Sequence, residues 1–112
     1  MLIVIGLSLI LFSNASSDRK LINEVVEIEK VIELPPEAHK LENYDRYYAE
    51  DGGENAHAIV GIFRFNSSGK GKVFVVSHTS LPAVFDGGCN VIHLRYSKSR
   101  NQFESIQCNG EG

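Results

Sequence analysis

Apolar residues fall into short runs, separated by polar or glycine-containing turns, along most of this chain. Residues 57–65 and 72–78 each predict a β-strand, and the loop between them, 66–71, holds two glycines that suit a hairpin turn. Residues 44–49 predict an earlier strand, which ends at the acidic and glycine-rich turn of residues 50–54. The pattern therefore predicts a succession of strands from residue 44 onward.

Two further strand-like runs lie between Cys89 and Cys108, on either side of a polar turn at residues 97–100. The two cysteines are equally far from the middle of this turn, so a symmetric hairpin would bring their sulfur atoms together across its open end. A disulfide closing a loop of this length contributes about 3 kcal/mol to stability in the chain-entropy model. The alternatives, a free thiol acting as nucleophile or as metal ligand, are less favoured.

The same symmetric register assigns the hairpin side chains to two faces, because successive residues of a strand point in opposite directions. The core face is predicted to hold Ile92, Leu94, Tyr96 and Phe103. The opposite face is predicted to hold His93, Arg95 and Glu104, beside the disulfide. Either a helix or the remaining strands would pack on the core face.

Residues 21–34 fit two kinds of secondary structure. An apolar stripe at helical spacing predicts a helix, formed by Leu21, Val25, Ile28 and Ile32. Pro35 and Pro36 would end such a helix. Several apolar residues also share the parity of a strand, and the β-branched residues of this segment lower its helix propensity. We expect a helix and keep a strand as the alternative.

These elements predict an α+β fold, with an N-terminal helix followed by a five-stranded, mostly antiparallel meander sheet and a C-terminal disulfide-closed hairpin. The chain is predicted to divide into three parts. Residues 1–17 form a signal peptide, residues 18–36 an N-terminal amphipathic segment with a Pro-Pro connector, and residues 37–112 a small antiparallel β domain. A domain this small is only marginally stable on its own, so a disulfide suits it.

The first 12 residues are apolar except for Gly6 and Ser8. A membrane-spanning helix needs about 20 apolar residues, so this run better fits the hydrophobic region of a secretory signal peptide. Cleavage after Ala15 or after Ser17 would satisfy the preference for small residues. No Lys or Arg precedes the run, which leaves a short buried strand as the alternative. The prediction is a periplasmic or extracellular protein whose mature form has no membrane span.

The charge of the 112-residue chain is unevenly distributed. Residues 18–54 contain 11 acidic and 5 basic residues, whereas residues 55–112 contain 3 acidic and 6 basic residues. The basic residues of the second part are spread over turns and strands, which argues against a nucleic-acid-binding surface. We expect the acidic and basic parts to complement one another within the molecule.

Residues capable of catalysis or metal binding form no recognisable motif. The four histidines, His39, His57, His78 and His93, lack the short spacing of zinc ligands, although neighbouring strands could bring three of them together. We therefore predict no cofactor, no metal ligand and no catalytic residue. An enzyme or metal-dependent factor that uses the strand histidines remains the alternative function.

One cluster is a candidate binding surface. Tyr44, Arg46 and Tyr48 alternate along a predicted strand and would share one face, and these residue types are enriched in interface hot spots. The alternative is that one or two of the tyrosines belong to the core and that Arg46 pairs with Asp45 or another nearby acidic residue. An exposed cluster would favour a small binding module for a protein of the cell envelope or a secreted protein.

Short motifs follow one another in a defined order: Leu34-Pro35-Pro36, Tyr44-x-Arg46-Tyr47-Tyr48-Ala49, Val60-Gly61-Ile62-Phe63, Leu81-Pro82-Ala83-Val84, Asp86-Gly87-Gly88-Cys89 and Cys108-Asn109-Gly110. In these motifs the chain resembles a group of small exported proteobacterial proteins that is uncharacterised. The most specific element is the bracket formed by the two cysteine motifs. The resemblance implies bacterial export and a periplasmic address, and it assigns no activity to any residue.

Overall fold

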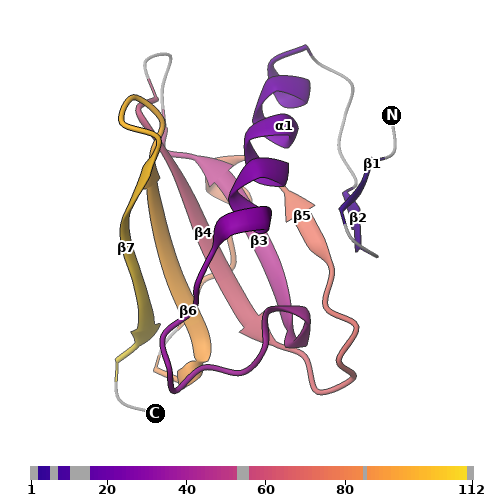
Figure 1. Ribbon diagram of the computed structural model, residues 1–112, viewed down its shortest axis with the longest axis vertical. Helices are drawn as coiled ribbons and strands as arrows, with labels where there is room; N and C mark the ends of the chain where they lie inside the picture. The colour runs from indigo at the N-terminus through magenta and orange to yellow at the C-terminus, as the bar shows by residue number, and fades with distance from the viewer. Residues whose placement is uncertain (1–2, 6–7, 11–15, 53–55, 85, 111–112) are drawn as a thin grey trace.

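A computed structural model of the chain describes residues 3–5, 8–10, 16–52, 56–84 and 86–110. One helix, α1 (Ser16–Val31), packs against one face of a five-stranded sheet with the strand order β5-β3-β4-β6-β7 (Figure 1). The strands of this sheet are β3 (Tyr44–Glu50), β4 (Ala58–Phe65), β5 (Val73–Val75), β6 (Gly88–Ser97) and β7 (Gln102–Asn109). The predicted helix followed by a five-stranded, mostly antiparallel sheet is confirmed.

The helix α1 is an amphipathic helix, so the helical interpretation of this segment is correct and the strand alternative is wrong. Its buried side chains are Leu21, Ile22, Val25 and Ile28, which share one face and pack on the sheet. It begins earlier than predicted and ends at Val31, four residues before Pro35. Burial of each aliphatic side chain contributes about 1.5–3 kcal/mol, which outweighs the low helix propensity of the β-branched residues.

The sheet is not a meander, because β5 does not lie beside β4. It pairs in parallel with β3 on the far side of that strand, whereas the pairs β3–β4, β4–β6 and β6–β7 are antiparallel. The meander prediction is therefore wrong in the position and direction of β5. The strand predicted at residues 72–78 is also shorter in the structure, where it is β5. His78 lies outside β5 and begins the 3-10 helix η2 (His78–Ser80).

The loop between β4 and β5 explains this position. It passes so close to the start of β3 that a Cβ atom on Gly71 would lie 1.9 Å from the carbonyl oxygen of Tyr44. The Asp45 carboxylate accepts hydrogen bonds from the backbone of Lys72 at 3.0 Å and from the side chain of Asn66 at 3.2 Å. These contacts carry the chain around the end of β3 and onto its free edge.

The hairpin of β6 and β7 contains the predicted disulfide, with the Cα atoms of Cys89 and Cys108 4.5 Å apart. The symmetric register is wrong, however. Gly88 lies opposite Asn109, but Cys108 lies opposite Ile92, so residues 89–91 of β6 form a bulge. Positive φ angles at residues 86–88 turn the chain into this bulge.

The prediction of which hairpin side chains share a face is correct, but the disulfide was predicted on the wrong face. The rings of Tyr96 and Phe103 lie 5.1 Å apart on the core face, and Arg95 pairs with Glu104 at 3.0 Å on the other face. Because Cys108 is paired with Ile92, which is fully buried, the disulfide lies on the core side. The two register shifts, between Gly88 and Ile92 and between Arg95 and Tyr96, could not be deduced from the spacing of the cysteines.

The connection from β5 to β6 runs behind the sheet, on the face opposite α1 (Figure 1). It holds His78 3.8 Å from Asp51, whose carboxylate also pairs with Arg95 at 2.7 Å. The structure thus has α1 on one face of the sheet and this connection on the other.

Residues 1–17, predicted as a signal peptide, are described only in part. They contain two short antiparallel strands, β1 (Ile3–Ile5) and β2 (Ser8–Ile10), and the first two residues of α1. Ala15 and the other residues of this segment lie outside the described ranges, so the signal peptide and its cleavage position stay predictions. No helix within the described residues is long and apolar enough to cross a membrane.

Candidate functional site

The predicted binding cluster on β3 lies in the core. Tyr44 and Tyr48 are 0% exposed and Arg46 is 4% exposed, because their shared face of β3 points toward α1. The prediction of an exposed binding surface is therefore wrong. The alternative is correct in kind: the tyrosines are core residues and Arg46 pairs with an acidic residue, which is Glu29 of α1 rather than Asp45.

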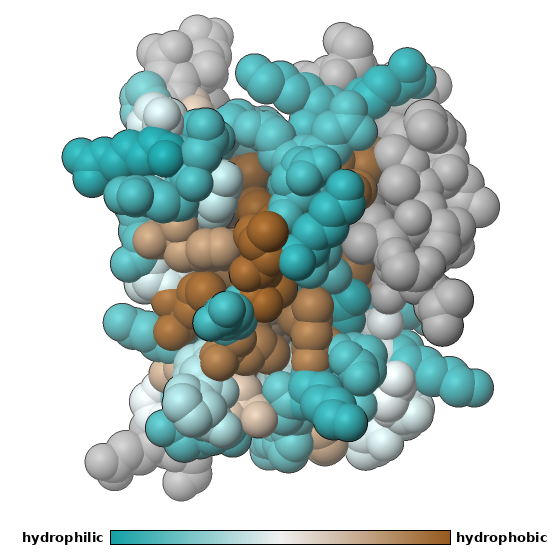
Figure 2. All heavy atoms as spheres, viewed as in Figure 1, coloured by the Kyte–Doolittle hydropathy of each residue, from teal (hydrophilic) through white to brown (hydrophobic). Residues whose placement is uncertain are grey.

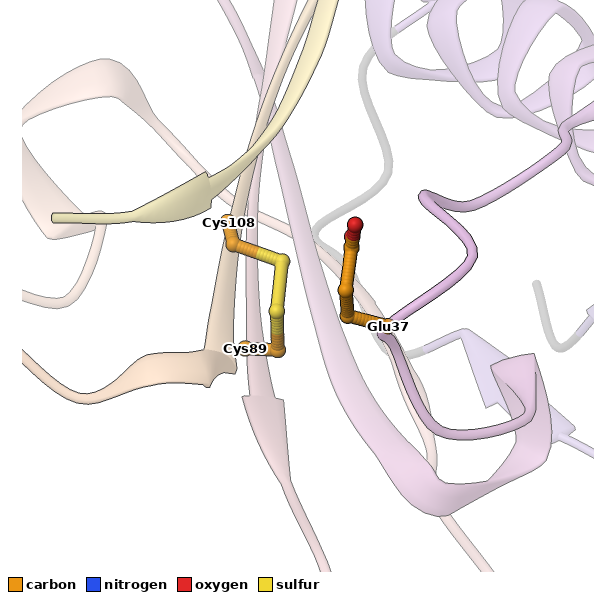
Figure 3. Close-up of side chains that lie close together, drawn as sticks. All are labelled: Glu37, Cys89 and Cys108. Carbon is orange, nitrogen blue, oxygen red and sulfur yellow. A yellow bond between two sulfur atoms is a disulfide. The ribbon is translucent and has the colours of Figure 1, made fainter. Parts of the chain in front are cut away.

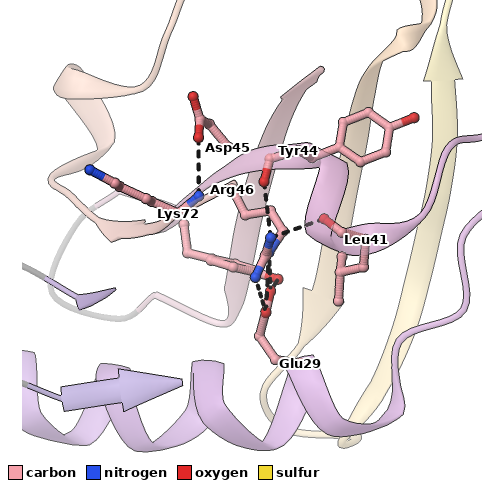
Figure 4. Close-up of polar contacts among 7 residues, drawn as sticks. Glu29, Leu41, Tyr44, Asp45, Arg46 and Lys72 are labelled. Carbon is pink, nitrogen blue, oxygen red and sulfur yellow. Dashed lines mark hydrogen bonds and ion pairs between the residues drawn. The ribbon is translucent and has the colours of Figure 1, made fainter. Parts of the chain in front are cut away.

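Glu29 and Arg46 form a buried ion pair between α1 and β3 (Figure 4). The Arg46 Nη2 and Nε atoms donate to the Glu29 carboxylate at 2.9–3.1 Å, and its Nη1 donates to the carbonyl oxygens of Leu41 and Tyr44, both at 2.9 Å. The Tyr48 hydroxyl donates to the same carboxylate at 2.5 Å. Burial, followed by the negative charge of Glu29, raises the pKa of Tyr48 well above its usual value. This network stabilises the helix–sheet contact and presents no group to a ligand at the surface.

A second network surrounds the bulge at Cys89. The Tyr44 hydroxyl donates to the Cys89 carbonyl oxygen at 2.5 Å and accepts from the His39 backbone at 3.1 Å. The His39 ring lies 4.1 Å from the ring of Phe65, and its Nε2 is 3.0 Å from the Asn90 side chain. The connector after α1, the start of β3 and the bulge are thereby fixed to one another.

The histidines do not converge. His39 lies in the connector, His57 just before β4, His78 in η2 and His93 within β6. Among the described residues, one group of three His, Cys, Asp or Glu side chains is close enough to hold a metal ion, and it consists of Glu37, Cys89 and Cys108. No histidine belongs to that group, so the geometry gives no support to an enzyme built on the strand histidines.

Apolar side chains reach the surface between α1 and β7, where brown side chains gather in Figure 2. We call this surface the apolar strip and define it by Val31, Ile32, Leu34, Phe103, Ile106 and Cys108. Val31, at the end of α1, is 63% exposed, whereas the other five are partly buried and pack against the core. The strip exists because one helix is too narrow to cover the whole inner face of a five-stranded sheet.

Acidic side chains border the apolar strip. Glu27 lies one helical turn before Val31, Glu33 lies between Ile32 and Leu34, and Glu37 lies beside the disulfide. Glu27 pairs with Lys30 at 3.2 Å, whereas the carboxylates of Glu33 and Glu37 make no contact of this kind with the described residues. Two carboxylates without an ion-pair partner among the described residues, those of Glu33 and Glu37, therefore lie next to residues of the strip.

The opposite face of the sheet carries a different group of side chains. The Tyr47 and Phe74 rings are stacked with their centroids 4.7 Å apart, and the Arg64 guanidinium lies 5.4 Å from the centre of the Tyr47 ring. Arg95 bridges Asp51 and Glu104 nearby. The side chains of this group are therefore engaged with one another.

Comparison with protein-family models, with curated proteins and with solved structures finds no match to this chain. The resemblance to exported proteobacterial proteins therefore stays an expectation. The class of the protein is defined by its own geometry, as one helix on a five-stranded mixed sheet with a disulfide at one end.

The apolar strip was not predicted from the sequence. Phe103 was predicted on the core face of the hairpin and Ile32 on the apolar stripe of the helix, but the sequence alone does not show how far α1 extends across the sheet. The one available signal was Val31, an apolar residue off the buried stripe at the end of the helix.

Proposed function

We propose that this protein is a small exported binding module and that the apolar strip is its docking surface for a segment of another protein. The single observation that carries the proposal is that Val31 is exposed at the end of α1 while five further apolar side chains, of the following connector and β7, are only partly buried. Contiguous exposed apolar surface with a polar border is typical of interaction sites. The disulfide Cys89–Cys108 supports export, because such bonds persist in oxidising compartments.

The charges around the strip favour a partner segment that carries apolar side chains flanked by Lys or Arg. Glu33 and Glu37 stand on the border with no ion-pair partner among the described residues, so basic groups of a ligand would find opposite charges there. Complementary charge of this kind speeds association and selects among partners, whereas the buried apolar area contributes most of the affinity.

A pair of synthetic peptides tests the chemistry of this partner. One is an amphipathic peptide of leucine and lysine, and the other has the same pattern with glutamate in place of lysine. We expect the oxidised protein to bind the lysine peptide in isothermal titration calorimetry and not to bind the glutamate peptide. Equal binding of both, or binding of neither, would contradict the proposal.

A matched pair of variants tests the location. V31K places a charge in the strip, and N23K adds the same charge on the exposed side of α1. V31K should weaken binding by about tenfold or more, which corresponds to about 1.4 kcal/mol, whereas N23K should have a much smaller effect. An equal loss in both variants would show that only net charge matters.

A second copy of the chain is the competing occupant. Sedimentation velocity of the wild-type protein and of V31K distinguishes a second copy from a different partner. A wild-type dimer that V31K dissociates would mean that another copy of the chain occupies the strip, and this would overturn the proposal of a basic partner. The wild-type protein can then be used to capture partners from a periplasmic extract. A captured protein supports the proposal only if the V31K variant does not retain it.

A further inference from the structure

The strongest unassigned cluster in the described residues joins a carboxylate to the disulfide. The side chain of Glu37 runs alongside the Cys89–Cys108 bond (Figure 3). A Glu37 carboxylate oxygen and both sulfur atoms all lie within 4.8 Å of one another. Glu37 makes no hydrogen bond or ion pair with the described residues, so its carboxylate is available to a ligand.

We propose that the dithiol form of this protein binds one Zn²⁺ ion through the Cys89 and Cys108 thiolates and the Glu37 carboxylate. Thiolate and carboxylate are ordinary zinc ligands, with Zn–S distances of about 2.3 Å and Zn–O distances of about 2.0–2.2 Å. A tetrahedral ion with such bonds has ligand atoms about 3.5–3.8 Å apart. Once the S–S bond is opened, movements of about 1 Å bring the three ligand atoms to this spacing.

The three ligands come from three segments that are each fixed by other contacts. Glu37 belongs to a turn closed by the hydrogen bond from the Ala38 backbone to the Pro35 carbonyl at 2.9 Å. The Tyr44 hydroxyl holds the Cys89 carbonyl, and Cys108 lies opposite the buried Ile92. None of these contacts uses a sulfur atom, so the ligands stay near one another when the disulfide is reduced.

The disulfide and the metal ion exclude each other, and a reductant controls which of them is present. A dithiol reductant transfers two electrons and two protons to the disulfide, forming the Cys89 and Cys108 thiols and its own cyclic disulfide. Zn²⁺ then displaces both thiol protons and bonds to the two sulfur atoms, with water completing the coordination. This redox-controlled site overlaps the docking surface proposed for the oxidised protein, because Cys108 belongs to the apolar strip and Glu37 to its border. Metal binding is measured without any docking partner, so the two proposals can fail separately.

The first experiment measures metal binding by the full chain in both redox states. The protein is reduced with a phosphine and titrated anaerobically with Zn²⁺ against a chromophoric chelator. We expect one equivalent to bind the reduced protein and none to bind the oxidised protein. Titration with Co²⁺ should give the intense visible and sulfur-to-metal bands of a tetrahedral thiolate site. Absence of binding by the reduced protein overturns the proposal.

Variants separate a three-ligand site from a simple pair of thiols. In the reduced state, E37Q should weaken Zn²⁺ binding by at least about tenfold, because even the loss of groups outside the coordination shell costs about 10–100-fold. E42Q changes another exposed glutamate, close in sequence, and should bind Zn²⁺ like the wild-type protein. Equal affinities of E37Q and the wild type would remove Glu37 from the site and overturn the proposal.

Folding of the reduced protein is followed in the same samples by near-ultraviolet circular dichroism. We expect native signals in the reduced protein, with or without Zn²⁺. If the reduced chain is unfolded and Zn²⁺ does not restore the native spectrum, any bound metal is held by the thiols of an unfolded chain. The three-ligand site of the folded protein would then not exist.

Discussion

Glu29 of α1 and Arg46 of β3 form an ion pair at 2.9 Å in which both side chains are only 5% exposed. The pair sits in the contact between the helix and the sheet and is completed by the Tyr48 hydroxyl. Burying two charges is costly, and their attraction offsets that cost only while both are present. The pair therefore makes the helix–sheet contact selective for one arrangement, since shifting α1 would leave two buried charges apart.

Replacement of Arg46 alone should destabilise the protein strongly. R46M leaves the Glu29 carboxylate buried without its counter-charge, and we expect a loss of about 3–5 kcal/mol in the free energy of unfolding. Urea denaturation of R46M and of the double variant E29M/R46M measures this. The double variant should be the more stable of the two, despite losing the hydrogen bond from Tyr48, which contributes about 1.5–3 kcal/mol. A double variant less stable than R46M would contradict this account.

The stability of the protein should fall as the solution becomes strongly alkaline. Burial and the adjacent Glu29 raise the pKa of Tyr48, and burial raises the pKa of Tyr44 despite the opposing hydrogen bond from the His39 backbone. Burial lowers the pKa of Lys98, but the hydrogen bond to Glu50 and the charges of Glu24 and Glu50 outweigh this and raise it overall.

Each of these groups keeps its proton to higher pH in the folded chain than in the unfolded chain. The stabilisation is therefore complete below the unfolded pKa, near 10 for tyrosine and 10.5 for lysine, and is lost as the pH rises toward the folded values. Urea denaturation from neutral pH to about pH 11 measures the slope. Y48F, which lacks one of the three groups, should lose stability less steeply. An unchanged slope in Y48F would exclude this contribution.

The sequence was sufficient for the predictions that rest on local patterns. The helix, the strands on either side of residues 51–57 and the cysteine pair follow from periodicity and spacing. Glu29 could have been recognised, because it shares the helical face of Val25 and Ile32 and is a carboxylate in an apolar stripe. The burial of Tyr44 and Arg46 could not be deduced, since alternation in a strand does not reveal which face the helix covers.

Addition of one methyl group at Gly71 should prevent native packing. In G71A the Cβ atom would overlap the Tyr44 carbonyl oxygen, so either β5 or the start of β3 must move, at a cost of about 1–3 kcal/mol or more. G52A is the matched control, because its Cβ has no atom within 4 Å and only a positive φ opposes it. Thermal denaturation should show a much larger loss for G71A. Similar losses in both variants would mean that the loop adapts freely.

Removal of the disulfide should lower stability without changing the fold. The bond joins residues 19 positions apart, and the double variant C89A/C108A should lose about 3 kcal/mol in the free energy of unfolding. The contacts of Tyr44 and His39 around the bulge remain in place, so near-ultraviolet circular dichroism at low temperature should stay native. A double variant that is unfolded under these conditions would show that the bond is required for the bulge to form.

The Glu37 carboxylate should slow reduction of the disulfide by negatively charged thiols. At a separation of 4.8 Å or less, repulsion between two charges in water amounts to about 1 kcal/mol, or roughly a fivefold change in rate. E37Q should therefore be reduced faster than the wild-type protein by glutathione and at a more similar rate by the cationic thiol cysteamine. Equal acceleration with both thiols would indicate a change in access rather than in charge.

The errors in the predicted topology share one physical cause. The position of β5 depends on the passage of Gly71 past Tyr44, and the disulfide register depends on the bulge at residues 89–91. Both are contacts between segments distant in sequence or irregularities of the backbone, and neither changes the hydrophobic pattern. Apolar periodicity reports which side chains are buried and is insensitive to strand order.

The two edges of the sheet are unequal, and this limits how the molecule can assemble. The edge strand β5 has three residues, whereas the edge strand β7 has eight. Growth of a fibre by addition of strands requires that every added chain presents a further free edge on which the next chain can pair. A chain with one long edge and one short edge can accept a neighbour through β7, and such a complex then has no second long edge from which to extend. The geometry permits pairs and opposes polymers.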